Sequence, residues 1–134
     1  RRQRQMCIRD RYPRLKLIEG SAIELPTIDK VKAEAEGFKK IIVCLDSNHT
    51  HDHVLAELEA YAPLTSSGSY CLVFDTVIDD MPKEMHQDRP WGPGNSPKSA
   101  VKEFLDKHDE FQIDSSVQDK LLITVAPDGY LKRK

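Results

Sequence analysis

Two aspartates follow two apolar runs, and a histidine lies close behind the first of them. The run Ile41–Leu45 ends in Asp46, and the run Tyr70–Phe74 ends in Asp75. His49 stands three residues after Asp46, where a segment with helical apolar spacing is about to begin. In open α/β sheets, ligands bind beyond the carboxyl ends of the strands, which is where both aspartates would lie.

If these strands are neighbours, the two carboxylates lie side by side. Paired carboxylates repel each other unless a cation or a shared proton lies between them. Oxygen ligands favour Mg²⁺, which usually takes only one or two protein carboxylates. The competing interpretation is that each aspartate caps the helix or turn that follows it. The residues alone leave both interpretations open.

The histidines allow a second kind of metal site. His49, His51 and His53 resemble part of the zinc motif of the metallo-β-lactamase fold, although Asp52 directly follows His51 instead of leaving a gap. On a helix His49 and His53 would share a face, whereas His51 would point elsewhere. A zinc-dependent hydrolase is therefore one alternative, and a non-catalytic α/β remnant is another. The interpretation favoured for His49 is a general base beside a bound metal.

Apolar runs alternate with helical patterns along the chain. We expect strands at 15–18, 41–45, 70–74, 111–113 and 121–125, and helices at 28–36, 51–61 and 97–108. This order is typical of an α/β fold, here a partial Rossmann-like, doubly wound, mostly parallel sheet with an antiparallel C-terminal hairpin. Residues 130–134 are interpreted as a basic tail.

The stretch 78–97 is expected to be a long loop, because it carries four prolines. Long connections in compact domains are often functional lids. Trp91 and Asn95 lie within this loop, and we expect them to contact the substrate.

Composition excludes several classes of protein. The 134 residues carry a net charge of −2, and no apolar run approaches the roughly 20 residues of a membrane span. The three cysteines have no metal-binding spacing and do not form an even-numbered disulfide framework. The lack of such a framework fits a reducing cytoplasm. The first eleven residues contain five arginines, a composition that could bind nucleic acid, but Met6–Arg11 resembles translated adapter sequence. We expect residues 1–11 to be non-native or disordered, residues 12–134 to form the domain, and nucleic acid not to be a partner.

Several motifs resemble the cephalosporin hydroxylase / rhamnosyl O-methyltransferase family. They are Leu45–Leu58, Tyr61–Leu64, Gly68–Tyr70, Phe74–Thr76, Arg89–Asn95, Pro97–Lys98 and Ala126–Lys132. The resemblance implies a class I methyltransferase fold that uses S-adenosylmethionine and a divalent metal, Mg²⁺ or Mn²⁺, at the ends of strands four and five.

The resemblance also assigns residues by position. Asp46 and Asp75 match metal ligands, Asp46 also borders the cofactor, and Thr76 falls where related enzymes have a third ligand. Glu19-Gly20-Ser21 matches the loop that borders the adenine of the cofactor. His49 matches a family histidine beside the metal.

The family's first two strands, with their glycine-rich cofactor loop, would precede Tyr12. We therefore expect an N-terminally truncated fragment that is inactive alone. Its parent would transfer a methyl group to a hydroxyl of a sugar, a glycolipid or a small natural product, in lipid biosynthesis for example. The resemblance also leaves a homo-oligomeric parent open.

Overall fold

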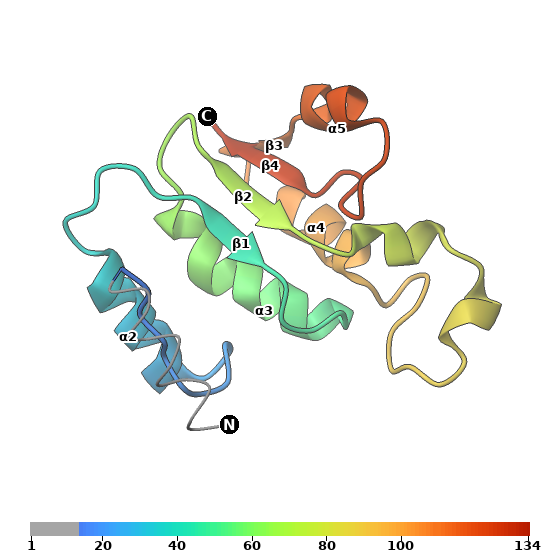
Figure 1. Ribbon diagram of the computed structural model, residues 1–134, viewed down its shortest axis with the longest axis horizontal. Coiled ribbons are helices and arrows are strands. Elements are labelled where there is room, and N and C mark those ends of the chain that lie inside the picture. Colours follow the sequence, from blue (N-terminus) through green and yellow to red (C-terminus); the bar gives the residue numbers. More distant parts are fainter. Residues whose placement is uncertain (1–13) are drawn as a thin grey trace.

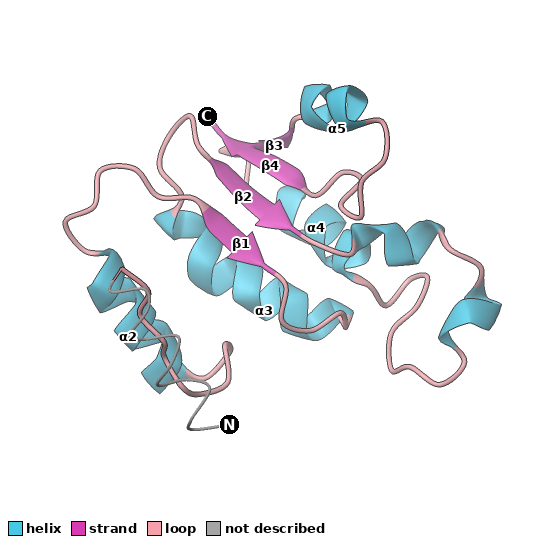
Figure 2. Cartoon of the chain, in the orientation of Figure 1, coloured by secondary structure: helices cyan, strands magenta, loops and turns pink. Residues whose placement is uncertain are grey.

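The computed structural model describes residues 14–134 as a sheet with helices packed against it (Figure 1). In chain order the helices and strands are α2 (Leu25–Ala35), β1 (Val43–Leu45), α3 (His51–Tyr61), β2 (Tyr70–Val73), α4 (Pro97–Leu105), β3 (Phe111–Ile113), α5 (Ser115–Leu121) and β4 (Tyr130–Arg133). Three 3₁₀ turns, η1 (Ala62–Leu64), η2 (Thr76–Asp80) and η3 (Lys83–His86), lie in the connections (Figure 2). The segment predicted to be non-native, residues 1–11, lies outside the described residues.

The sheet is mixed. Its strand order is β1-β2-β4-β3, with β1 parallel to β2, and β4 antiparallel to both β2 and β3. The α/β class and the antiparallel C-terminal pairing are confirmed. The expectation of a mostly parallel sheet is wrong for residues 14–134, because β4 separates β2 from β3 and reverses the direction of pairing on both sides.

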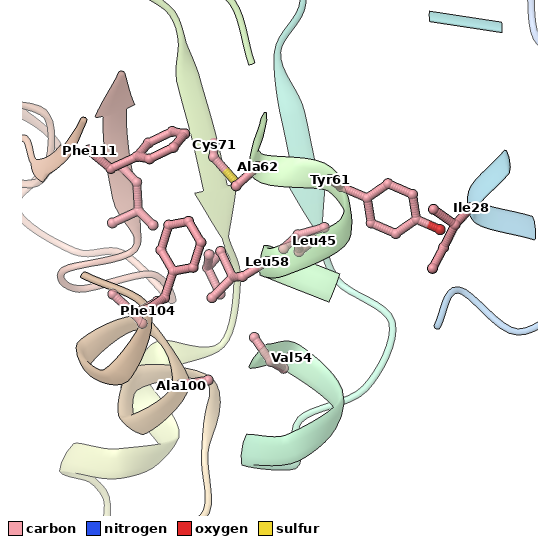
Figure 3. Packing of buried hydrophobic residues seen from close by; sticks show 13 residues of the cluster. Ile28, Leu45, Val54, Leu58, Tyr61, Ala62, Cys71, Ala100, Phe104 and Phe111 are labelled. Carbon is pink, nitrogen blue, oxygen red and sulfur yellow. The ribbon is translucent and has the colours of Figure 1, made fainter. Parts of the chain in front are cut away.

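Helices α3 and α4 cover one face of the sheet and enclose the core (Figure 1). Val54 and Leu58 of α3 and Val101 and Phe104 of α4 are at most 2% exposed. They pack with inward-facing strand residues such as Leu131, which is fully buried. Figure 3 shows Leu58 and Phe104 in the same cluster as Cys71 of β2. Removing these side chains from water is the main force that holds the helices on the sheet.

Local sequence signals set the helix ends. Ser96 caps α4: its hydroxyl accepts the Ser99 N–H, and the Ser99 side chain reaches back to the Ser96 N–H. Pro97 follows in the first turn, where a missing N–H costs nothing. Helix α3 begins and ends as predicted. Helix α2 begins at Leu25, three residues before the predicted start, because its proline also falls in the first turn.

Two predicted strands are wrong. Residues 121–125 lie at the end of α5 and in the loop beyond it, where Leu122 and Ile123 are 88% and 91% exposed. Asp114 starts this helix by accepting the Ser116 N–H, and this local capping outweighs the β-forming composition of the apolar run. Residues 15–18 are irregular.

The supposed basic tail is strand β4. Leu131 is fully buried in the core, whereas Lys132 and Arg133 are half-buried, so the charged composition concealed a strand that has only one buried apolar residue. None of the helices in residues 14–134 has the length and apolarity needed to cross a bilayer.

Candidate metal and acceptor site

The parallel pair β1–β2 brings the two aspartates together. Leu45 and Val73 are register partners, and the Leu45 carbonyl accepts the Phe74 N–H at 3.0 Å. Asp46 and Asp75 therefore leave the same edge of the sheet at nearly the same level. One ligand atom from each of Asp46, His49 and Asp75 lies within 4.8 Å of the others. The predicted convergence of two carboxylates and a histidine is confirmed as geometry.

His49 lies between the carboxylates. Its Nε2 is 2.9 Å from Asp75 Oδ2 and 3.9 Å from Asp46 Oδ1. The side chains of His49 and Asp75 are 24% and 33% exposed, whereas that of Asp46 is 62% exposed. The group is thus open to solvent on the Asp46 side and sheltered on the other.

The turn that carries His49 is fixed by its own side chains. Asn48 Oδ1 accepts both the N–H and the hydroxyl of Thr50 at 2.9 Å. Ser47 donates its hydroxyl to Glu57 of α3 at 2.7 Å. Asx-type bonds of this kind hold a turn without regular backbone pairing. The contact of Glu57 with this turn was not predicted from the sequence. The signal that could have indicated it is an acidic residue among the buried positions of α3.

Asp75 has an unusual backbone. Its φ of 56° and ψ of 24° place it in the left-handed region, which non-glycine residues seldom adopt. Aspartate tolerates this region better than most side chains, and such conformations cluster at functional sites. The kink turns the chain out of β2 into η2 and directs the carboxylate toward His49.

Thr76 has a different environment from the one expected of a ligand. It is fully buried, and its hydroxyl donates to the Pro127 carbonyl at 2.6 Å. This bond ties η2 to the turn before β4. The predicted ligand role of Thr76 stays a prediction, but its hydroxyl proton is already engaged within the protein.

The loop between η3 and α4 covers the site. The ring of Trp91 lies edge-to-face against His49, with centroids 4.9 Å apart, and the Arg89 guanidinium lies 5.4 Å from the centre of the Trp91 ring. Trp91 therefore packs directly against the histidine of the metal-like group. Its contact with substrate stays a prediction.

Asn95 holds this loop in place. Its Oδ1 accepts the His51 N–H at the start of α3, and its Nδ2 donates to the Pro90 carbonyl, both at 2.8 Å. Both polar groups of the amide are thus used inside the protein. The geometry supports a positioning role for Asn95, and its predicted substrate contact remains untested.

Asp79 anchors the far end of the same loop. Its Oδ1 accepts the Gly94 N–H at 2.8 Å and the Ser96 hydroxyl at 2.7 Å. Partial burial works against ionisation, but the bonds from Ser96 and Gly94 and the charge of Lys98 outweigh it and hold the pKa of Asp79 below its usual value.

The three histidines do not form one zinc site. His51 contacts Ser99 and Glu103 of α4 at 2.9 and 3.0 Å, and His53 Nε2 lies 3.2 Å from the Ser47 hydroxyl. Only His49 joins the metal-like group found among the described residues. The zinc-hydrolase alternative is therefore not favoured.

The predicted cofactor loop, Glu19-Gly20-Ser21, lies beside β1. Gly20 lines a groove that also contains Leu45, the residue before Asp46. A Cβ at Gly20 would come within 2.2 Å of the Thr27 hydroxyl oxygen, so this close approach requires glycine. Glu19 is exposed and Ser21 is half-buried. Their roles at the cofactor, and that of Asp46, stay predictions.

Comparisons with known proteins agree with the resemblance. The model of the family described as "Rhamnosyl O-methyltransferase/CmcI" matches residues 1–134. Proteins named rhamnosyl O-methyltransferase from Mycobacterium bovis (strain BCG / Pasteur 1173P2) and Mycobacterium tuberculosis (strain ATCC 25618 / H37Rv) are each 33% identical over 127 residues, which is 92% of this chain and 49% of theirs. The Mycobacterium leprae protein of the same name is 31% identical over 107 residues, 80% of this chain and 44% of its own length. The chain thus spans about half the length of the curated relatives it matches. No solved structure gives a significant match.

Proposed function

Because the chain belongs to the rhamnosyl O-methyltransferase/CmcI family, we propose that it supplies the metal and acceptor site of an O-methyltransferase. The proposed reaction moves a methyl group from S-adenosylmethionine to a hydroxyl of a sugar, a glycolipid or a small natural product. The observation that carries this proposal is the convergence of Asp46, His49 and Asp75 at one sheet edge.

The donor set fits a hard divalent cation. Two carboxylates can bind Mg²⁺ or Mn²⁺ and leave positions for water and for an acceptor oxygen. Asp46 and Asp75 would hold this cation. When bound, it would lower the pKa of the acceptor hydroxyl and orient it, while S-adenosylmethionine would supply the methyl group.

His49 is the proposed proton acceptor. Its Nε2 faces the carboxylates, so it lies beside the place where a hydroxyl would lose its proton. Once Nε2 has taken up the proton, Asp75 Oδ2, at 2.9 Å, would accept the new Nε2–H and stabilise the positive charge that the imidazole gains. Trp91 shields one edge of the ring from solvent. These contacts also allow His49 to be a third metal ligand. The two roles predict different results for a His49 variant, because a ligand is needed for metal binding and a base is needed only for methyl transfer.

The test uses a chimera that has the full length of a relative. Residues 14–134 would be joined to the part of the Mycobacterium tuberculosis protein outside the match, and transfer of labelled methyl from S-adenosylmethionine to a rhamnosyl acceptor would be measured. We expect activity with Mg²⁺ that disappears with a chelator and in Asp46→Ala. Asp52→Asn removes an exposed acidic charge outside the group and should retain activity. Activity that survives both the chelator and Asp46→Ala would refute the metal site.

A further inference from the structure

A buried carboxylate on α3 has no part in the proposed chemistry. Glu57 is only 2% exposed, and it shares the buried side of the helix with the core residues Val54 and Leu58. Burying a carboxylate is unfavourable unless hydrogen bonds compensate for the lost water. Its Oε1 accepts the Ser47 hydroxyl, whereas its Oε2 has no hydrogen-bond partner within residues 14–134. Positions that depart from stable packing in this way are often functional.

The bond to Ser47 is one link in a longer chain of hydrogen bonds. His53 Nε2 lies 3.2 Å from the Ser47 hydroxyl oxygen, and His53 and Glu57, four residues apart, share one face of α3. A serine hydroxyl has a single proton, and Ser47 donates it to Glu57 at 2.7 Å. His53 must therefore supply the proton of the other bond, so its Nε2 carries a hydrogen. The chain runs from His53 through Ser47 to the buried carboxylate.

These bonds hold the backbone on one side of Asp46. Leu45, the residue before Asp46, is held in the sheet, because its carbonyl accepts the Phe74 N–H at 3.0 Å. Ser47, the residue after it, is tied to α3 by the two side-chain bonds. The Asp46 carboxylate itself is 62% exposed, and His49 Nε2, at 3.9 Å, is too far away to form a hydrogen bond with it. The direction of this carboxylate therefore depends on the backbone that carries it.

From these contacts we propose that Ser47, His53 and Glu57 are positioning residues for the metal site. Their hydrogen bonds hold the Asp46 backbone so that its carboxylate faces the cation shared with Asp75. The proposal rests on the proposed function, because it requires a divalent cation between these two aspartates. A ligand that is already fixed loses less conformational freedom when it binds, so loss of the chain of hydrogen bonds should weaken metal binding.

Mn²⁺ binding by the 134-residue chain tests this proposal. Trp91 lies against His49, so bound paramagnetic Mn²⁺ should quench its fluorescence and report the affinity. Ser47→Ala removes both hydrogen bonds at an exposed position, where the substitution leaves no cavity. We expect its Mn²⁺ affinity to fall about tenfold, the lower end of the usual effect of losing a group that orients a metal ligand.

Ser67→Ala is the matched control. It removes another exposed hydroxyl, which donates to the Lys134 carbonyl at 2.8 Å. Ser67 precedes β2, whereas Asp75 follows it, so the control lies at the opposite end of that strand from the site. This variant should bind Mn²⁺ like the unchanged chain.

Substitutions of Glu57 separate positioning from stability. Glu57→Leu removes the acceptor but fills the buried position with an apolar side chain, which is often neutral or stabilising for the fold. We expect a Tm no lower than that of the unchanged chain, together with Mn²⁺ affinity about tenfold lower. Glu57→Gln retains an oxygen that can accept the Ser47 proton, so its affinity should stay within about threefold of the unchanged chain. That rescue would exclude the loss of charge as the cause.

Three results would overturn the proposal. Equal Mn²⁺ affinity of Ser47→Ala and Ser67→Ala would show that the hydrogen bonds do not position Asp46. A loss of affinity in Glu57→Leu that is accompanied by a lower Tm would leave Glu57 with a structural role only. Absence of quenching by Mn²⁺ in the unchanged chain would refute the metal site itself, and this result distinguishes failure of the proposed function from failure of the positioning role alone.

Discussion

Asp46→Asn should make the metal-free protein more stable and its metal binding weaker. Oxygens of Asp46 and Asp75 lie within 4.8 Å of each other. Two unit charges at that distance repel by about 0.9 kcal/mol in a water-like dielectric and about 3.5 kcal/mol at an effective dielectric of 20. Because Asp46 is 62% exposed, the lower value applies.

The substitution removes this repulsion and costs little else. Apart from Asp75, the nearest polar partner of Asp46 in this group is His49, whose Nε2 lies 3.9 Å from Asp46 Oδ1, too far for a hydrogen bond. At pH 8 with a chelator, we expect the unfolding free energy to rise by about 0.5–1 kcal/mol, a rise in Tm of about 2–5 °C. Losing one of two carboxylate ligands should weaken Mn²⁺ binding at least tenfold, about 1.4 kcal/mol.

The single tryptophan provides the assay. Trp91 lies against His49, so paramagnetic Mn²⁺ held by Asp46 and Asp75 should quench its fluorescence. Thermal melts with and without Mn²⁺ give the stability on the same samples, and Asp52→Asn serves as the charge-matched control. A lower Tm for Asp46→Asn in chelator, or unchanged quenching by Mn²⁺, would refute the reasoning.

Four further outcomes are expected. His49→Gln in the chimera should abolish methyl transfer but keep Mn²⁺ quenching within about threefold, and loss of quenching would make His49 a ligand instead of a base. Asn95→Ala should shift Trp91 emission to the red and cost about 1 kcal/mol of stability, because the loop loses its bonds to His51 and Pro90; an unchanged spectrum would show that other contacts hold the loop. The lowered pKa of Asp79 stabilises the fold above about pH 4, and this stability is lost as pH falls through the folded-state value, so acid melts of Asp79→Asn should be flatter below pH 4 than those of the unchanged chain. Calorimetric titration of the chain alone with S-adenosylmethionine should show no micromolar binding, and such binding would contradict the expected dependence on a glycine-rich loop supplied elsewhere.

The sequence predicted the site geometry because that geometry depends on short-range order. Two apolar runs that each end in an aspartate are expected to form parallel strands when a helix connects them. His49 lies in the turn between the first strand and that helix. Asn95 and Thr76 depend instead on contacts across more than 40 residues, with His51 and Pro127. No local pattern contains those partners, so their main contacts were not predicted.

The fold was predicted least well where composition and position disagree. Leu121–Val125 has the side chains of a strand but lies outside the sheet, and Tyr130–Arg133 has the charges of a tail but lies in the middle of it. Strand propensity reflects half-buried packing, and only the tertiary structure decides which segment receives it. Glu57 belongs to the same case, because its burial depends on Ser47 and on the groove beside β1.

The central position of β4 also constrains how the chain folds during synthesis. Strands β1 and β2 and the helix between them can associate as soon as they leave the ribosome, because their contacts are close in sequence. Strand β3 cannot join the sheet until β4, which follows it in the chain, has emerged, since β4 bridges β2 and β3. At roughly 5–20 residues per second, the interval from Val73 to Arg133 lasts on the order of 3–12 s. Throughout that time the edge of β2 that pairs with β4 remains exposed, and this is the period when a chaperone would be most useful.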